Sequence, residues 1–132
     1  MDIQIDNSDD IDEIQAKLGV EFKGEFKTIG YHMPKGKLIV VITDLTAHSC
    51  EVSGMATGKW FHTDIYADLF NYIFNVLGCS RITYVVDVDN HKCINLLERG
   101  GAVRECKLRG VDRYLYSMIR EDIYGQSKQQ FI

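Results

Sequence analysis

Cysteine thiols can bind metals or form disulfides, and the chain contains four of them: Cys50, Cys79, Cys93 and Cys106. No two of these cysteines have the C-x-x-C spacing that is typical of zinc sites. The first fifteen residues are acidic and lack the basic-then-apolar pattern of a secretory leader. The pattern therefore predicts reduced thiols in a cytoplasmic protein, and no metal site.

Three aspartates, Asp9, Asp10 and Asp12, lie close together near the N-terminus. They follow Asn7 and Ser8, whose side chains are good helix caps. The helix dipole favours acidic side chains in the first turn. An acidic helix face therefore explains these aspartates better than metal binding does.

The composition is that of one ordinary globular domain, residues 1–132, with 45% hydrophobic and 26% charged residues. The net charge of −4 argues against a general electrostatic grip on nucleic acid, because phosphate binding needs a basic face. The longest apolar runs are far too short to span a bilayer. We therefore expect a soluble α/β domain with a single core.

The first half of the chain predicts strands and one amphipathic helix. Alternation of polar and apolar residues predicts a strand over 2–6, and Ile11, Ile14 and Leu18 predict a helix that Gly19 closes. Further strands are predicted at 25–33, 38–42 and 50–56, the first two joined as a hairpin by turn residues 34–37.

The second half predicts a βαβ-like centre followed by a hairpin. Ile65, Leu69, Ile73 and Leu77 recur at four-residue spacing and predict a strongly apolar helix that ends at Gly78. The remaining prediction is a strand at 81–88, a helix at 91–99, strands near 102–108 and 113–119, and a loose polar tail at 120–132. The whole order predicts a mixed sheet with helices on both faces.

Residues 90–109, NHKCINLLERGGAVRECKLR, resemble the segment N-x-x-S-x-x-x-L-x-x-x-G-F-x-x-E-G-x-x-R of the GNAT N-acetyltransferase superfamily. The residues in register with it are Asn90, Leu97, Gly101, Glu105 and Arg109. The helix and strand before this segment and the final strand DRYLYSMIRED are also similar to the family. The resemblance covers about residues 25–122 and is strongest to small GNAT-like proteins of bacteriophages.

The resemblance implies a GNAT-like α/β fold, with a mixed, mostly antiparallel sheet flanked by helices and a central βαβ-like acetyl-CoA cradle. It implies an acetyl-CoA-dependent N-acetyltransferase that acts on an amine of a protein or a small molecule. The strand before the loop would offer its backbone to the pantetheine arm at Met55, Ala56 and Thr57. The residues implied for the pyrophosphate, through backbone N–H groups at a helix N-terminus, are Gly58, Lys59, Trp60, Phe61, His62 and Thr63. Asn90 would meet the cofactor as well as cap its helix.

GNAT chemistry needs a base to take a proton from the attacking ammonium. The resemblance places Glu51 in that role, although a surface charge on a half-exposed strand also explains it, and His48 and His62 are alternatives by residue type. The family's usual acid, a tyrosine, is replaced by Leu97. Candidate donors of a proton to the thiolate are Cys93 and Tyr116, which packing alone also explains.

Several positions depart from the family pattern. The loop has one glycine instead of three, the bulky Trp60 and Phe61 stand where backbone usually approaches phosphate, and Ala102 replaces a phenylalanine. A catalytically degenerate phage protein that keeps the fold for a structural or binding role, in the host cytoplasm or the virion, is therefore the alternative. Pairing through the sheet edge or the last strands would give a homodimer, which the sequence leaves open.

Overall fold

A computed structural model describes residues 1–61 and 63–129. The elements in chain order are β1 (Asp2–Ile5), α1 (Ser8–Leu18), β2 (Lys27–Met33), β3 (Gly36–Thr43), β4 (Ser49–Gly58), α2 (Thr63–Asn71), the π-helix η1 (Tyr72–Val76), β5 (Arg81–Asp87), α3 (His91–Arg99), β6 (Val103–Lys107), β7 (Arg113–Ile119) and α4 (Arg120–Gln129). Every strand and helix that the sequence predicts is present, with end points shifted by a few residues.

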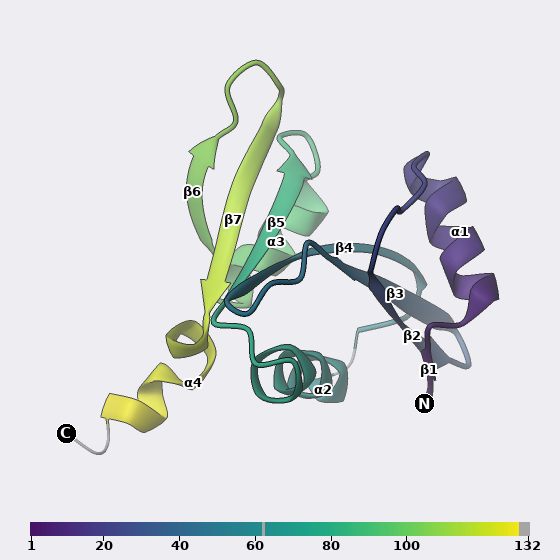
Figure 1. Ribbon diagram of the computed structural model, residues 1–132, viewed down its shortest axis with the longest axis horizontal. Coiled ribbons are helices and arrows are strands. Elements are labelled where there is room, and N and C mark those ends of the chain that lie inside the picture. Colours follow the sequence, from purple (N-terminus) through teal and green to yellow (C-terminus); the bar gives the residue numbers. More distant parts are fainter. Residues whose placement is uncertain (62, 130–132) are drawn as a thin grey trace.

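The strands form one seven-stranded sheet in the order β1-β2-β3-β4-β5-β7-β6. All neighbours are antiparallel except β4 and β5, which are parallel because the α2–η1 segment crosses over between them. Figure 1 shows the sheet in two parts that point in different directions: β1 to β4 form one part, and the tall β5–β7–β6 group forms the other. The mixed, mostly antiparallel α/β sheet that the sequence predicts is therefore confirmed.

Helices pack on both faces of the sheet. The larger core lies between the sheet and the helices α2 and α3, and includes Ile65, Phe70 and Leu97 from these helices. A smaller core lies under α1, where Ile14 packs with Ile39 of β3. Figure 1 shows α1 and α2 on opposite sides of the β1–β4 part. The two faces of β4 are therefore covered by different helices.

The start and end of α1 follow the sequence closely. Asn7 Oδ1 accepts from the backbone N–H groups of Asp9 and Asp10 at 3.0 and 3.2 Å. At the other end Gly19 adopts a left-handed conformation with φ 68° and closes the helix. Both signals are local, which is why the sequence suffices to place them.

The structure refines one prediction about the helices and contradicts another. The helix expected to run to Gly78 stops being α-helical at Asn71 and continues as η1, where Leu77 N donates to Tyr72 O at 2.8 Å. The tail expected to be loose is helical over Arg120–Gln129. Asp122 accepts from the backbone N–H of Ile119 at 2.9 Å, which starts this helix in the manner of a cap. In the described part of the chain, no helix combines the length and apolarity needed to cross a membrane.

Candidate active site

The β4–β5 pair holds together over only three residues. Ser49 to Glu51 pair with Arg81 to Thr83, and the pairing then stops. Beyond that point β4 stays with β3 as far as Gly58, while β5 follows β7 as far as Asp87. The two strands therefore diverge (Figure 1), and the edge of β4 after Glu51 that would face β5 has no partner strand among the described residues. An unpaired edge presents backbone N–H and C=O groups that can bind an extended ligand.

Glu51 lies at the vertex of this divergence. It is the last residue of β4 that pairs with β5, opposite Thr83, and it also pairs with Thr43 of β3. Its side chain is half-buried. Burial raises the pKa of this carboxyl above 4.5, and a hydrogen bond and like charge from Asp44 raise it further. Such a carboxylate holds a proton more readily than an exposed one, as a general base must.

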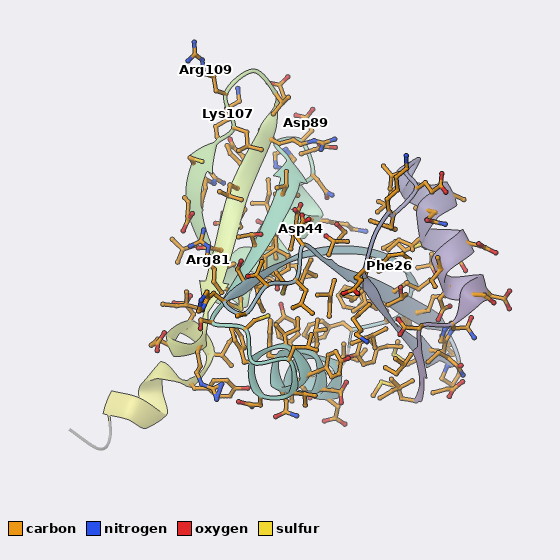
Figure 2. The ribbon with its side chains drawn as sticks, viewed as in Figure 1. Phe26, Asp44, Arg81, Asp89, Lys107 and Arg109 are labelled. Carbon is orange, nitrogen blue, oxygen red and sulfur yellow. The ribbon has the colours of Figure 1, made fainter. Side chains whose placement is uncertain are left out.

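Asp44 is the partner that sequence reasoning missed. It directly follows β3 and has a positive φ of 50°, a conformation that Asp tolerates better than most residues. Figure 2 labels Asp44 near the point where β4 and β5 part. The register of Thr43 with Glu51 brings Asp44 to the vertex. Because that register depends on packing between strands, no local sequence motif around Asp44 predicts it.

α3 begins just after β5, at the end of that strand away from its pairing with β4. Asn90 caps α3, since its Oδ1 accepts from Cys93 N at 3.2 Å, and its side chain is exposed. Burial raises the pKa of the half-buried Cys93 thiol, so that it stays protonated at neutral pH. Cys93 packs against the larger core, as do Tyr66 of α2 and Tyr84 of β5.

Tyr116, the other candidate acid, is completely buried on β7. Its hydroxyl donates to the Glu98 carboxylate in a short hydrogen bond and accepts from Arg104 Nε at 2.9 Å. The Arg104 guanidinium also stacks over the Tyr114 ring at 4.0 Å. These contacts tie the end of α3 to β6 and β7, and they direct the hydroxyl proton of Tyr116 towards the Glu98 carboxylate. A role for Tyr116 as acid stays a prediction, and the geometry leaves Cys93 the freer donor.

The strand that leads into the predicted phosphate loop has mixed exposure. Met55 is buried in the smaller core beneath α1, whereas Ala56 and Thr57 are exposed. A side chain at Gly58, which has φ 64°, would clash with the carbonyl of Lys35 in the β2–β3 turn. This close approach explains the single glycine of the loop.

The loop after Gly58 is fastened to the same turn. The backbone N–H of Lys59 donates to Lys35 O at 2.9 Å, so it is not free to bind a phosphate. Trp60 is half-buried and Phe61 is 59% exposed, with their ring centroids 5.8 Å apart. Thr63 begins α2, which gives the loop a helix N-terminus. The predicted contribution of His62 lies outside the described residues.

Two other residues singled out in the sequence, His48 and Asp10, lie away from the vertex. His48 precedes β4 at the closed end of the β4–β5 pair, where its carbonyl accepts from Ser80 N at 2.8 Å, and its side chain is exposed. Asp10, which the sequence offered only as part of an acidic helix face, is 3% exposed and lies 3.0 Å from Nε2 of His32. Gly30 makes room for it, because a side chain there would clash with the Asp10 carboxylate. A glycine inside a strand is the signal that could have indicated this close approach.

Solved structures identify the fold. The Campylobacter jejuni N-acetyltransferase PseH superposes with a TM-score of 0.67 at 17% identity, over 89% of this chain and 98% of that chain. PseH in complex with acetyl coenzyme A gives 0.64 at 16% identity, over 89% and 99%. A mutant of the Vibrio cholerae spermidine N-acetyltransferase SpeG gives 0.64 at 19% identity, over 90% and 79%.

Sequence comparisons add no relative. No protein-family model matches the chain, and no curated protein matches it. At identities below 20%, the three structures above show the fold and nothing finer. The chain therefore has the mixed α/β fold of the GNAT N-acetyltransferases.

Proposed function

We propose that the protein is an acetyl-CoA-dependent N-acetyltransferase that acts on an amine acceptor. The observation that carries the proposal is the divergence of β4 and β5 with Glu51 at its vertex. Structures that share this fold include N-acetyltransferases, one of them solved with acetyl coenzyme A. Their amine substrates are the reason to look for an amine acceptor here.

The divergent strands suit the donor. The unpaired edge of β4 beyond Glu51, at Met55, Ala56 and Thr57, can pair with the amide-bearing pantetheine arm as a further strand would. The loop that follows leads to the N-terminus of α2, which favours the pyrophosphate electrostatically. Asn90, at the start of α3, would contact the donor from the side opposite β4. The acetyl thioester supplies the activated acyl group.

The chemistry then falls to a few residues. Glu51 takes a proton from the acceptor ammonium, directly or through water, so that the neutral nitrogen can attack the thioester carbonyl carbon. A backbone N–H of the β4 edge holds the oxyanion that develops. As the C–S bond breaks, the protonated thiol of Cys93 can return a proton to the leaving thiolate. The second proton that the attacking nitrogen loses returns Cys93 to its thiol form, so that the new amide, the free thiol of CoA and one proton on Glu51 account for all atoms.

Calorimetric titration with acetyl-CoA, with a thermal melt alongside, tests the proposal. A ligand that binds only the folded protein must raise the melting temperature. Micromolar binding, followed by transfer to a panel of amines that is lost in Glu51→Gln, is the expected result. The absence of binding at millimolar acetyl-CoA would overturn it. Substitutions at Gly58 are poor probes, because any side chain there would clash with Lys35 whether or not a ligand binds.

The alternative is a GNAT-fold protein of bacteriophage type that has lost turnover and serves a structural or binding role, in the host cytoplasm or the virion. Two observations favour it. The backbone N–H of Lys59 already donates a hydrogen bond to Lys35 O, and Leu97 is buried at the position where the family carries a tyrosine acid. Stoichiometric acetyl-CoA binding without transfer to any amine would favour this alternative.

A further inference from the structure

The seven-stranded sheet ends in two open edges, one at β1 and the other at β6. In the described part of the chain, each of these strands has a neighbour on one side only: β2 lies beside β1, and β7 lies beside β6. An edge strand leaves backbone N–H and C=O groups available to another strand. The two edges are therefore the places where the sheet can continue into another molecule.

The β1 edge is apolar and acidic. The backbone N–H of Asp6 donates to Thr28 O of β2 at 2.8 Å. Because the backbone groups of an antiparallel strand alternate in direction, those of Ile3 and Ile5 point to the open edge. The side chains of these isoleucines are 41% and 53% exposed. Asp2 and Asp6 flank them, and the first sixteen positions of the chain contain no lysine or arginine.

The β6 edge is basic. All five residues of this strand are exposed. Arg104 and Lys107 belong to the strand, and Arg109 belongs to the turn that follows it. The acidic residue of the strand, Glu105, is paired with Arg81, whose guanidinium donates to both carboxylate oxygens at 2.8 and 2.6 Å. The charge that β6 presents to a neighbour is therefore positive.

Lys107 is well placed to meet a further strand. Leu108 N donates to Arg113 O of β7 at 2.8 Å, so the backbone groups of Lys107 point to the open edge. Its ammonium lies 3.3 Å from Asp112, in an exposed ion pair of the kind that contributes little to stability. Figure 2 shows Arg109 at the tip of the β6–β7 hairpin, directed away from the rest of the molecule.

The charges of the two edges determine which pairing is favourable. Two β1 strands side by side would bring together Asp2 and Asp6 of both copies. Two β6 strands would likewise bring together Arg104 and Lys107 of both copies. Like charges on neighbouring strands are destabilising, and they protect an edge against a copy of itself. They give β1 no protection against β6, because there acidic side chains meet basic ones.

We propose that the protein associates head to tail, with β1 of one copy pairing with β6 of a second copy so that the sheet continues. The contact covers Ile3 and Ile5, to which the second copy offers Val103, itself 53% exposed. It also brings Asp2 and Asp6 of one copy near the basic side chains of β6 in the other. Such a contact is heterologous, so each pair of copies keeps one edge of each kind open and can grow further. The inference does not depend on the proposed function.

Sedimentation velocity of the full chain tests whether the copies associate. We expect the mass of the wild type to rise with concentration beyond that of a dimer. Raising the salt from about 0.01 to about 1 M shortens the Debye length from about 30 to about 3 Å, and should weaken the association at least about tenfold. A wild type that stays monomeric at millimolar concentration, or an association that salt leaves unchanged, would overturn the inference.

Two variants that each block one edge identify the pairing. Ile3→Lys introduces a cation into β1, and Lys107→Glu introduces an anion into β6, both at exposed positions. Each variant alone should be monomeric. Their equimolar mixture should form a dimer of one copy of each, through the intact β6 of the first variant and the intact β1 of the second. A mixture that stays monomeric would overturn the inference, as would a dimer of either variant alone, which would indicate pairing between edges of the same kind.

Matched controls make the same changes away from both edges. Val20→Lys and Lys23→Glu alter exposed residues of the α1–β2 connection, and both variants should associate as the wild type does. Circular dichroism establishes that each variant is folded. Loss of association in these controls to the same extent as in Ile3→Lys and Lys107→Glu would show that net charge, and not the two edges, governs the association, and would overturn the inference.

Discussion

Replacement of Glu51 by glutamine is the most informative perturbation of the vertex. Glutamine preserves the shape of the side chain and its place opposite Thr83, but it cannot accept a proton from the acceptor amine. A positioned general base contributes about 10²–10⁴-fold to rate, which corresponds to about 3–5 kcal/mol of the barrier. We therefore expect kcat/KM of Glu51→Gln to fall by that factor, with acetyl-CoA affinity unchanged.

The raised pKa of Glu51 also predicts the direction in which activity changes with pH. Burial and Asp44 hold the pKa of Glu51 above 4.5, so activity should fall as the pH drops through this raised value and the base becomes protonated. Asp44→Asn removes the like charge and should move the acidic limb of the profile to lower pH. A limb that stays in place, or moves to higher pH, would contradict the coupling between the two carboxyls.

Stability should respond in the opposite direction to activity. Because the folded-state pKa of Glu51 lies above its ordinary value, the folded protein binds more protons than the unfolded chain in that window. Its stability therefore decreases as the pH rises through the window. Glu51→Gln should abolish this decrease and melt at or above the wild-type temperature at pH 7.

The assay is a steady-state measurement of free CoA thiol released, with Glu21→Gln, a change at an exposed position outside the sheet, as the matched control. The result that would refute the assignment is a folded Glu51→Gln that keeps kcat/KM within a factor of about three, far less than a base contributes. A loss of both activity and folding would contradict the stability argument instead.

Three further predictions concern the scaffold. Tyr116→Phe should lower the free energy of unfolding by about 1–3 kcal/mol in urea denaturation, because Glu98 loses a buried hydrogen-bond donor, while kcat/KM stays within about twofold if Tyr116 is not the acid. Gly30→Ala should destabilise by at least about 1 kcal/mol in a thermal melt, because its methyl group would clash with the Asp10 carboxylate. The arginine of β5 lowers the pKa of Glu105 to about 2, so Glu105→Gln should remove stability that wild type shows above pH 4.5 and loses as the pH falls towards 2.

Local signals in the sequence sufficed for most of the fold. The cap of α1, its closing glycine and the hairpin turn are decided by residues within a few positions of one another. The shift from α2 to η1 could not be predicted in this way, because four-residue spacing of apolar residues serves an α-helix and a π-helix alike. The helical tail depends on Asp122 and on Tyr124, which packs on Phe74 far away in sequence.

The candidate site was predictable only in part, for a similar reason. Glu51 and Asn90 follow from strand and cap positions that the resemblance supplies. The proximity of Asp44 to Glu51, and that of Lys35 to Gly58, depend on the register of β3 with its neighbours. Register is set by packing across strands, so no window of the sequence contains it.

The same distinction bears on whether catalysis survives the atypical loop. The position of Glu51 is set by the point where the β4–β5 pairing ends, and the whole sheet determines that point. The predicted phosphate loop is held at its start by the contacts of Gly58 and Lys59 with Lys35. A change in the loop can therefore alter how the donor is held without moving the base. For this reason we expect the departures of the loop from the family pattern to appear in KM for acetyl-CoA rather than in kcat.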